Sequence, residues 1–398
     1  MGAPRLLDLT RSLRRAGRIA TGVDRVEHAY LDQFLKDDVT GFGLMRTAFG
    51  YILLDRDGLR AFQERLEGRA GWCAADLMSR LPRRRNETLK RAETDMRKHA
   101  IARCLPSRLR KMLDQHLPQG FDYFNVGHSN LTERVLNSVK YASGEIHVLI
   151  HDVIPLEYPH FQRAGTVKPF QEKLKRVRRL ADRVIYNSDD TRRRTEALMR
   201  EWGDLPTSIV AHLGTIPVVS NPLALPKGLP TAQPYFVTVG TIEPRKNHAF
   251  LLDLWEQMGS DAPPLLICGN RGWNNDAVFA RLDNLPENSP IVEISGLGDT
   301  ALAALIEDCA GVLFPSHAEG FGLPPVEALQ LGARVLCNEL TVLREILDHS
   351  VTFAPVSDGE LWLKTIESWE NTPPLADKET SFVGPSWPDH FKTVLRLK

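Results

Sequence analysis

The sequence has few cysteines and no long apolar run. Its 398 residues include five cysteines, an odd number at wide spacings, which disfavours a disulfide framework or a zinc site and indicates reduced thiols. No segment reaches the roughly 18 apolar residues that a membrane-spanning helix needs, and the N-terminus lacks the apolar stretch of a signal peptide. These absences predict a cytoplasmic globular protein of two domains, because one hydrophobic core rarely organises so long a chain.

The chain carries no net charge, but its charges are unevenly divided. Residues 1–225 contain 38 Lys and Arg against 27 Asp and Glu, whereas residues 226–398 contain 12 against 23. Attraction between two oppositely charged domains explains this asymmetry without any ligand. The alternative is that the basic half meets something anionic, such as a membrane surface or an acidic acceptor.

Short apolar runs alternate with helical patterns along most of the sequence. In the second half the runs YFVTVG, PLLICG, IVEISG, GVLFPS, RVLCN and VTFAP are near-continuous, as expected for strands buried on both faces of a parallel sheet. A proline-rich stretch at residues 213–234 predicts a linker. We therefore expect an α/β protein of two Rossmann-like, doubly wound domains, 1–222 and 223–380, which face a central cleft.

Residues 57–117 interrupt this alternation. The block is rich in Arg and Lys, shows amphipathic helical spacing and has little strand signal, so it predicts a basic helical insertion. One interpretation is a solvated helical hairpin, and the other is a surface that docks on an anionic membrane or acceptor.

The segment HAEGFGLPPVEAL, which begins at His317, combines two glutamates with two glycines and a proline pair. The prolines predict the first turn of a helix from Leu323 to Gln330, where no amide hydrogen is needed. The glycines before it allow backbone N–H groups to approach a ligand, and a helix N-terminus favours an anion. An anion site beside the carboxylates Glu319 and Glu327 needs a ligand that satisfies both.

A nucleotide sugar has the required layout, with a diphosphate between two hydroxyl-bearing ends. A carboxylate accepts two hydrogen bonds from adjacent hydroxyls, so Glu327 can hold one sugar while Glu319 addresses the other. The segment VGTIEPRKN supplies cations for the diphosphate, because Gly240 ends a buried strand and Arg245 and Lys246 follow it.

Four segments together resemble the retaining GT-B glycosyltransferases of family 4, also called group 1: VGTIEPRKN, HAEGFGLPPVEA, TGVDRVEHAYL and IHDVIPLEYP. The resemblance implies a GT-B fold and transfer of a hexosyl, favoured as mannosyl, unit from a nucleotide sugar, with GDP-mannose the favoured donor. It implies no metal or other cofactor. It also implies a glycan or lipid-linked acceptor in bacterial surface polysaccharide synthesis, at the inner face of the cytoplasmic membrane, and a final helix within 381–398 that returns to the first domain.

The resemblance assigns roles to individual residues. Glu319 contacts the transferred sugar, Glu327 holds the ribose, and Arg245 and Lys246 neutralise the diphosphate. His151 lies beside the donor sugar. The remaining donor-side positions are Gly240, the glycine Gly22 of an N-terminal loop that faces the phosphates, and the backbone amides around Phe321, Gly322 and Leu323.

Several of these residues also have simpler interpretations. His151 ends an apolar strand and could be a hydrogen-bonded core residue, and Gly22 could serve only to start a helix. Asp152 either orients His151 or caps the next turn. His128 faces the expected cleft and is a candidate for acceptor contact. The triplet from Asp55 to Asp57 matches a metal-binding D-x-D pattern, but reads equally well as a turn.

Two other function classes remain open at this stage. A GT-B-fold sugar-nucleotide epimerase would release free sugar and nucleoside diphosphate without an acceptor. A non-catalytic scaffold would keep only the fold, which the presence of Glu319, Arg245, Lys246 and His151 disfavours. Nucleic-acid binding is disfavoured because the basic half lacks a motif with interleaved aromatic residues.

Overall fold

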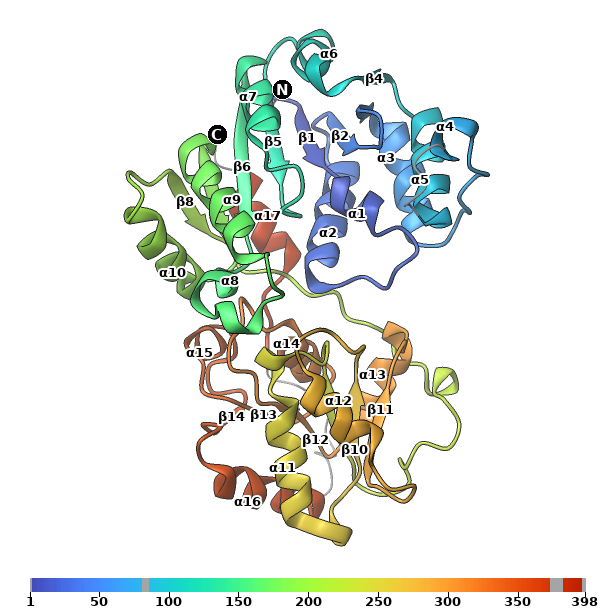
Figure 1. The fold of residues 1–398 in the computed structure, drawn as a ribbon, viewed down its shortest axis with the longest axis vertical. Coiled ribbons are helices and arrows are strands. Elements are labelled where there is room, and N and C mark those ends of the chain that lie inside the picture. Colours follow the sequence, from blue (N-terminus) through green and yellow to red (C-terminus); the bar gives the residue numbers. More distant parts are fainter. Residues whose placement is uncertain (1, 81–85, 373–381, 396–398) are drawn as a thin grey trace.

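The computed structural model describes residues 2–80, 86–372 and 382–395. It shows two α/β domains, one above the other in Figure 1, each built around its own sheet. None of the helices in these described ranges is both long and apolar enough to cross a membrane. The two sheets confirm the expectation of two doubly wound domains.

The N-terminal sheet has eight strands in the order β4-β3-β2-β1-β5-β6-β7-β8. All neighbours are parallel except β3, which is antiparallel to both β2 and β4. The strands are β1 (Arg5–Asp8), β2 (Gly41–Arg46), β3 (Tyr51–Leu54), β4 (Ala102–Cys104), β5 (Phe121–Asn125), β6 (Gly144–Ile150), β7 (Arg183–Tyr186) and β8 (Thr207–Val210).

The N-terminal helices connect these strands and cover the sheet. They are α1 (Thr10–Arg14), α2 (Gly22–Lys36), α3 (Arg56–Leu66), α4 (Leu77–Arg80), α5 (Glu87–Lys98), α6 (Leu109–His116), α7 (Glu133–Tyr141), α8 (Ile154–Glu157), α9 (Val167–Leu180) and α10 (Asp189–Arg200). Two 3₁₀ turns, η1 (Pro106–Arg108) and η2 (Pro159–Phe161), lie between them.

The C-terminal sheet has six parallel strands in the order β11-β10-β9-β12-β13-β14. They are β9 (Phe236–Val239), β10 (Leu265–Cys268), β11 (Ile291–Ile294), β12 (Gly311–Phe314), β13 (Val335–Cys337) and β14 (Thr352–Phe353). The helices are α11 (His248–Met258), α12 (Asp276–Asp283), α13 (Asp299–Asp308), α14 (Leu323–Gln330), α15 (Thr341–Leu347) and α16 (Gly359–Glu370), with 3₁₀ turns η3 (Pro222–Ala224), η4 (Pro244–Lys246) and η5 (Gly259–Asp261).

The position of the site follows from this topology. Strand order reverses between β9 and β12, which are neighbours in the sheet although two strands separate them in sequence. Loops that leave the carboxyl ends of such strands diverge and form a crevice for a ligand. The two segments singled out in the sequence follow β9 and β12, so the fold brings them together.

The block at 57–117 is not wholly helical. Besides α3, α4, α5 and α6 it contains β4, which pairs antiparallel with β3 and ends the sheet. The expectation of a helical block with little strand structure holds, but β4 was not predicted, because a three-residue edge strand that is only partly buried has no apolar run to reveal it. Residues 81–85, part of the basic run of this block, lie outside the described residues.

The last helix, α17 (Trp387–Leu395), packs against the N-terminal domain although it follows the C-terminal one (Figure 1). Phe391 meets the ring of Tyr30 at 5.0 Å between centroids, and the Tyr30 hydroxyl lies 2.9 Å from Nε2 of His390. These contacts hold α17 on the N-terminal domain. In the rest of the predicted segment, residues 382–386 are irregular, and residue 381 and residues 396–398 lie outside the described part.

Candidate active site

The loops after β9 and β12 place three charged side chains in contact. Lys246 Nζ lies 2.6 Å from Oε1 of Glu319, and Arg245 Nη1 lies 2.8 Å from Oε2 of the same carboxylate. A backbone hydrogen bond from His317 N to Arg245 O joins the two loops directly. Arg245 and Lys246 belong to the 3₁₀ turn η4, one turn before α11, rather than to the helix itself.

The environment of this cluster keeps Glu319 ionised. Burial alone would raise the pKa of the Glu319 carboxyl, but the positive charges of Arg245 and Lys246 lower it to about 2. Burial lowers the pKa of Lys246, and Glu319 opposes that shift. The Lys246 ammonium also lies 4.3 Å from the centroid of the Phe314 ring. The result is a buried carboxylate held between two cations, whose remaining N–H donors can reach an anionic ligand.

Gly240 packs against the side chain of Lys246, and Glu243 forms an ion pair with Arg245. Gly240 has a φ of 142°, and a Cβ there would lie 3.2 Å from Cε of Lys246, so glycine leaves room for the lysine side chain. Glu243 Oε1 lies 2.7 Å from Nε of Arg245. The pKa of Glu243 is raised, because the effect of burial exceeds the opposing effect of the charges on Arg245 and Lys246.

Helix α14 begins directly after the glycine-rich loop, with its two prolines in the first turn. Gly322 is the N-cap, with φ 94°, a left-handed conformation that favours glycine. Within the described residues, the backbone N–H groups of Phe321, Gly322 and Leu323 donate no hydrogen bond. These free amides and the helix dipole make the start of α14 suited to an anion.

Glu327 lies on α14 and contacts the N-terminal domain. Its Oε1 is 2.6 Å from Nη1 of Arg25, and the same guanidinium lies 2.8 Å from Asp299 through Nη2. The pKa of Glu327 is raised, because the effect of burial exceeds the opposing effect of the Arg25 charge. Gly22 faces the same helix, because a Cβ there would lie 3.2 Å from Cδ1 of Leu323.

His151 follows β6 and is buried where the N-terminal domain meets the loop of Glu319. Its Nε2 lies 2.6 Å from the carbonyl oxygen of Val126, and burial lowers its pKa to about 4. His151 is therefore a neutral imidazole at physiological pH. The Asp152 carboxylate accepts a hydrogen bond of 3.1 Å from Ile154 N at the next turn, and no hydrogen bond joins it to His151 within the described residues.

His128 lies beside His151 in the N-terminal domain, and Lys173 is close enough to affect His128 electrostatically. The rings of His128 and His151 are 5.0 Å apart, and Phe170 lies 6.4 Å beyond His128. Lys173 Nζ is 6.0 Å from the Phe170 centroid, and no carboxylate within the described residues forms an ion pair with it. Burial lowers the pKa of Lys173, and two nearby arginines lower it further.

The domains touch through several contacts that the sequence did not indicate. Thr191 Oγ1 donates to the carbonyl of Gly320 at 3.0 Å. Glu345 of α15 accepts hydrogen bonds from the first amides of α10, at 2.6 Å from Asp189 N and 2.9 Å from Asp190 N. The loop that carries Glu319 is therefore held against the N-terminal domain through the carbonyl of Gly320.

A second bridge lies near the start of the same loop. The ring of Phe161, in η2, stacks on His317 at 5.8 Å, and Trp273 Nε1 donates to the Phe161 carbonyl at 2.9 Å. Arg163 lies over the Trp273 ring at 4.9 Å. This segment of the N-terminal domain covers one side of the Glu319 loop.

The D-x-D triplet and the cysteines have structural explanations in this fold. Asp55 of the D-x-D triplet accepts a hydrogen bond of 3.0 Å from Gly58 N and caps α3. The cysteines are free thiols: Cys268, Cys309 and Cys337 are buried, while Cys73 and Cys104 are half-buried.

Comparison with known proteins agrees with this architecture. Residues 225–381 match the family model described as "Glycosyl transferases group 1". The C-terminal domain is thus similar to group 1 glycosyltransferases. The matched residues include both acidic positions, Glu319 and Glu327, and both cations, Arg245 and Lys246.

Curated proteins that are similar to part of this chain are mannosyltransferases. The serotype-specific mannosyltransferase WbdA of Escherichia coli is 30% identical over 252 residues, which cover 59% of this chain and 31% of WbdA. The O-antigen chain mannosyltransferase RfbU of Salmonella typhimurium is 25% identical over 163 residues, 40% of this chain and 45% of RfbU. The chain thus matches about a third to a half of the length of these relatives.

Solved structures extend the likeness to the whole chain at the level of fold. Sucrose-phosphate synthase from Thermosynechococcus elongatus aligns with a TM-score of 0.64 at 15% identity and covers 100% of this chain and 98% of its own. Anabaena Alr3699/HepE in complex with UDP-glucose aligns with a TM-score of 0.62 at 12% identity, over 98% and 95%. The predicted GT-B fold is confirmed.

Proposed function

We propose that the protein is a retaining glycosyltransferase that moves a mannosyl unit from a nucleoside diphosphate sugar, GDP-mannose, to a glycan or lipid-linked acceptor of a bacterial surface polysaccharide. The observation that carries the proposal is the contact of Glu319 with both Arg245 and Lys246, beside the start of α14. The printed names of the relatives, which are mannosyltransferases, support the sugar.

In this proposal each group acts on one part of the donor. Arg245 and Lys246 use the N–H donors that Glu319 leaves free to hold the diphosphate, together with the amides at the start of α14. Glu327 accepts from the ribose hydroxyls through Oε2, which has no hydrogen bond within the described residues, while Arg25 stays on Oε1. Glu319 addresses the hydroxyls of the transferred sugar.

The proposed reaction proceeds on one face of the sugar. The bond from the anomeric carbon to the diphosphate oxygen breaks, and the acceptor hydroxyl attacks from the same side, which retains the configuration. The hydroxyl proton passes to an oxygen of the departing diphosphate. Arg245 and Lys246 stabilise the negative charge that develops on that leaving group, so no metal ion is needed. The neutral imidazole of His151 donates through Nε2 to the carbonyl oxygen of Val126, which leaves Nδ1 to accept a hydrogen bond from a sugar hydroxyl.

The positive charge of Lys173 supports the proposal of a phosphate-bearing acceptor. Lys173 is half-buried without a carboxylate partner in the described residues, and burial together with Arg176 and Arg11 lowers its pKa. A phosphate of a lipid-linked acceptor would supply the missing negative charge. A peripheral contact of the basic block at 57–117 with an anionic membrane would bring such an acceptor to the cleft.

The test is turnover of labelled donors by the full chain. We expect release of nucleoside diphosphate and labelled glycan from GDP-mannose, faster than from UDP-glucose or ADP- and dTDP-sugars, and unchanged by a chelator. Free sugar released without an acceptor would indicate an epimerase instead, and binding without turnover of any donor would indicate a scaffold.

A pair of variants links this activity to the site. Glu319→Gln leaves Lys246 and Arg245 without their carboxylate and should lower kcat about 10²- to 10³-fold, by analogy with the loss of one transition-state group. The matched control is Glu293→Gln, which removes a carboxylate from a partly exposed ion pair of 2.7 Å with Arg271. Equal activity in the two variants would contradict the proposed role of Glu319.

A further inference from the structure

A second cluster of ligand-type side chains lies in the N-terminal domain, away from the cleft. Asp122 is on β5 and Glu145 and His147 are on β6, and the parallel register pairs Asp122 with Glu145 and Phe124 with His147. Positions two apart on a strand share a face, so all three side chains lie on one face of the sheet. They are near the start of these strands, and Glu145 and His147 lie roughly 20 Å and 13 Å along β6 from His151, which directly follows its other end.

The three side chains are close enough to share one ion. Nε2 of His147 lies 3.5 Å from Oδ1 of Asp122 and 3.9 Å from Oε2 of Glu145, and all the ligand atoms are within 4.8 Å of one another. A tetrahedral ion with bonds of about 2.0–2.2 Å holds its ligand atoms about 3.3–3.6 Å apart. The pair from Asp122 and His147 already has this spacing, and the Glu145 side chain, 57% exposed, is free to adjust.

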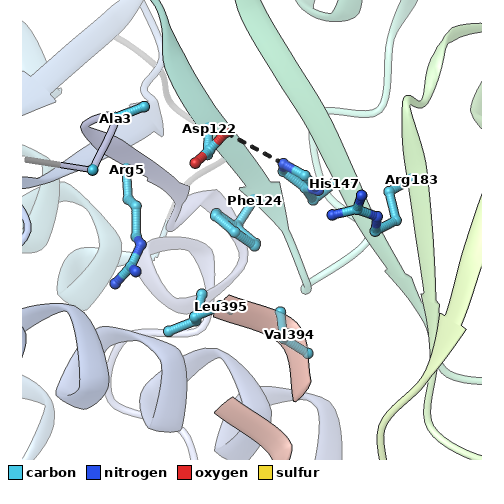
Figure 2. Close-up of a pocket in the computed structure, with 9 residues that line it drawn as sticks. Ala3, Arg5, Asp122, Phe124, His147, Arg183, Val394 and Leu395 are labelled. Carbon is cyan, nitrogen blue, oxygen red and sulfur yellow. Dashed lines mark ion pairs between the residues drawn. The ribbon is translucent and has the colours of Figure 1, made fainter. Parts of the chain in front are cut away.

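The imidazole of His147 is held in place with an unused ring nitrogen. His147 is 5% exposed, and its ring stacks on Phe124 with 4.7 Å between centroids and 18° between planes. Its Nε2 forms no hydrogen bond within the described residues. A buried polar atom of this kind needs a partner, and Figure 2 shows the ring edge turned toward Asp122 beside a cavity.

The carboxylates give a second reason for a cation at this point. Asp122 and Glu145 are directly opposite on neighbouring strands, where like charges repel. At 3.5 and 3.9 Å, Nε2 of His147 is too far from either carboxylate for a good hydrogen bond. The positive charge of Arg183, the register neighbour of His147 on β7, limits the affinity of the cluster for any cation.

We infer that Asp122, Glu145 and His147 form a binding site for a divalent transition-metal ion, with Zn²⁺ the ion best suited to one imidazole and two carboxylates. Solvent would complete the coordination from the cavity. The same cavity is lined by Gly2 and Ala3 at the start of the chain and by Val394 and Leu395 of α17 (Figure 2). The ion would therefore stabilise the packing of α17 on the N-terminal domain and take no part in sugar transfer.

The test is metal binding to the full chain after treatment with a chelator. Titration with ZnCl₂ in a calorimeter should show one equivalent bound and a raised melting temperature, and Co²⁺ should give the visible absorption of a four-coordinate ion. His147→Gln should weaken binding at least about tenfold, as expected for loss of a first ligand. Glu145→Gln should also weaken it, and cannot disturb the core because its side chain is largely exposed.

The control is His349→Gln. His349 Nε2 also lies 3.5 Å from an aspartate, Asp348, but both side chains are exposed and no third ligand is nearby in the described residues. This variant should bind Zn²⁺ like the unaltered chain. Binding well below one equivalent, or equal affinity in the His147, Glu145 and His349 variants, would overturn the inference.

Discussion

Gly320 packs against the backbone of His151 so closely that a side chain at Gly320 would overlap the His151 carbonyl oxygen and lie 2.9 Å from Cβ of Asp152. The two residues belong to different domains, and the contact brings the loop of Glu319 to the strand end that carries His151. The glycine is required here by proximity, because its φ is not among the positive values of the chain.

Gly320→Ala should therefore impair closure of the domains while each domain stays folded. We expect kcat/KM to fall about 10²-fold, the scale of a small misplacement of catalytic groups, with a melting temperature near that of the unaltered chain. Kinetics and thermal unfolding measure the two effects. Gly71→Ala is the control, because a Cβ at Gly71 would meet nothing within 4 Å. A fully active Gly320→Ala enzyme would show that this contact is not needed for turnover.

Glu327 and Asp299 share one arginine, and this allows the ribose assignment to be tested. Arg25 bonds both carboxylates, at 2.6 Å and 2.8 Å. Glu327→Ala should raise the donor KM about 10- to 100-fold with a smaller change in kcat, because it removes hydrogen bonds to a charged group. Asp299→Ala removes the other partner of Arg25 and should leave KM nearly unchanged. Equal effects of both changes would assign the role to the arginine instead of the ribose contact.

The sequence predicted the elements that local chemistry determines. Near-continuous apolar runs identified β9 and β12, and the proline pair placed α14 at the bounds observed, Leu323–Gln330. The edge strand β4 was missed because its three residues are only partly buried. The contact of Arg25 with Glu327 was not predicted either. The two residues are 302 positions apart, and the sequence around neither residue indicates the other.

Glu345 connects the domains through the N-terminus of α10, and its removal should favour an open form. Its carboxylate accepts from the amides of Asp189 and Asp190, and His212 Nε2 lies 2.9 Å away. Glu345→Ala should increase the radius of gyration measured by small-angle scattering and raise the donor KM several-fold. Because Ser188 still caps α10, the helix itself should persist.

The control for this variant lies in the same domain. Glu339→Ala removes a carboxylate that bonds Arg344 at 3.0 Å within the C-terminal domain. It should leave both scattering and KM unchanged. If Glu345→Ala scatters like the Glu339 variant, the contact with α10 does not hold the domains together.

Glu27 gives the protein a dependence of stability on pH that can be removed by one change. The side chain is fully buried in α2 and accepts a hydrogen bond of 2.9 Å from Ser12 N. Burial raises the pKa of Glu27 to about 8 from an ordinary value of 4.5, and the nearby Asp8 adds to the rise while Ser12 opposes it. Between pH 4.5 and about 8, Glu27 therefore keeps a proton in the folded state that it has lost in the unfolded state.

The sign follows from proton binding. Because the folded state binds more protons between pH 4.5 and about 8, the contribution of Glu27 to stability is fully present below pH 4.5 and is lost as pH rises through about 8. Glu27→Gln keeps a neutral side chain at every pH. Its free energy of unfolding, measured with urea from about pH 5 to about pH 8.5, should rise relative to the unaltered chain as pH increases, by up to about 1.4 kcal/mol per pH unit. Glu201→Gln, at an exposed position, should show the same pH dependence as the unaltered chain. Parallel curves for the Glu27 variant and the unaltered chain would mean that Glu27 is ionised in the folded state, in contact with a positive charge or with water.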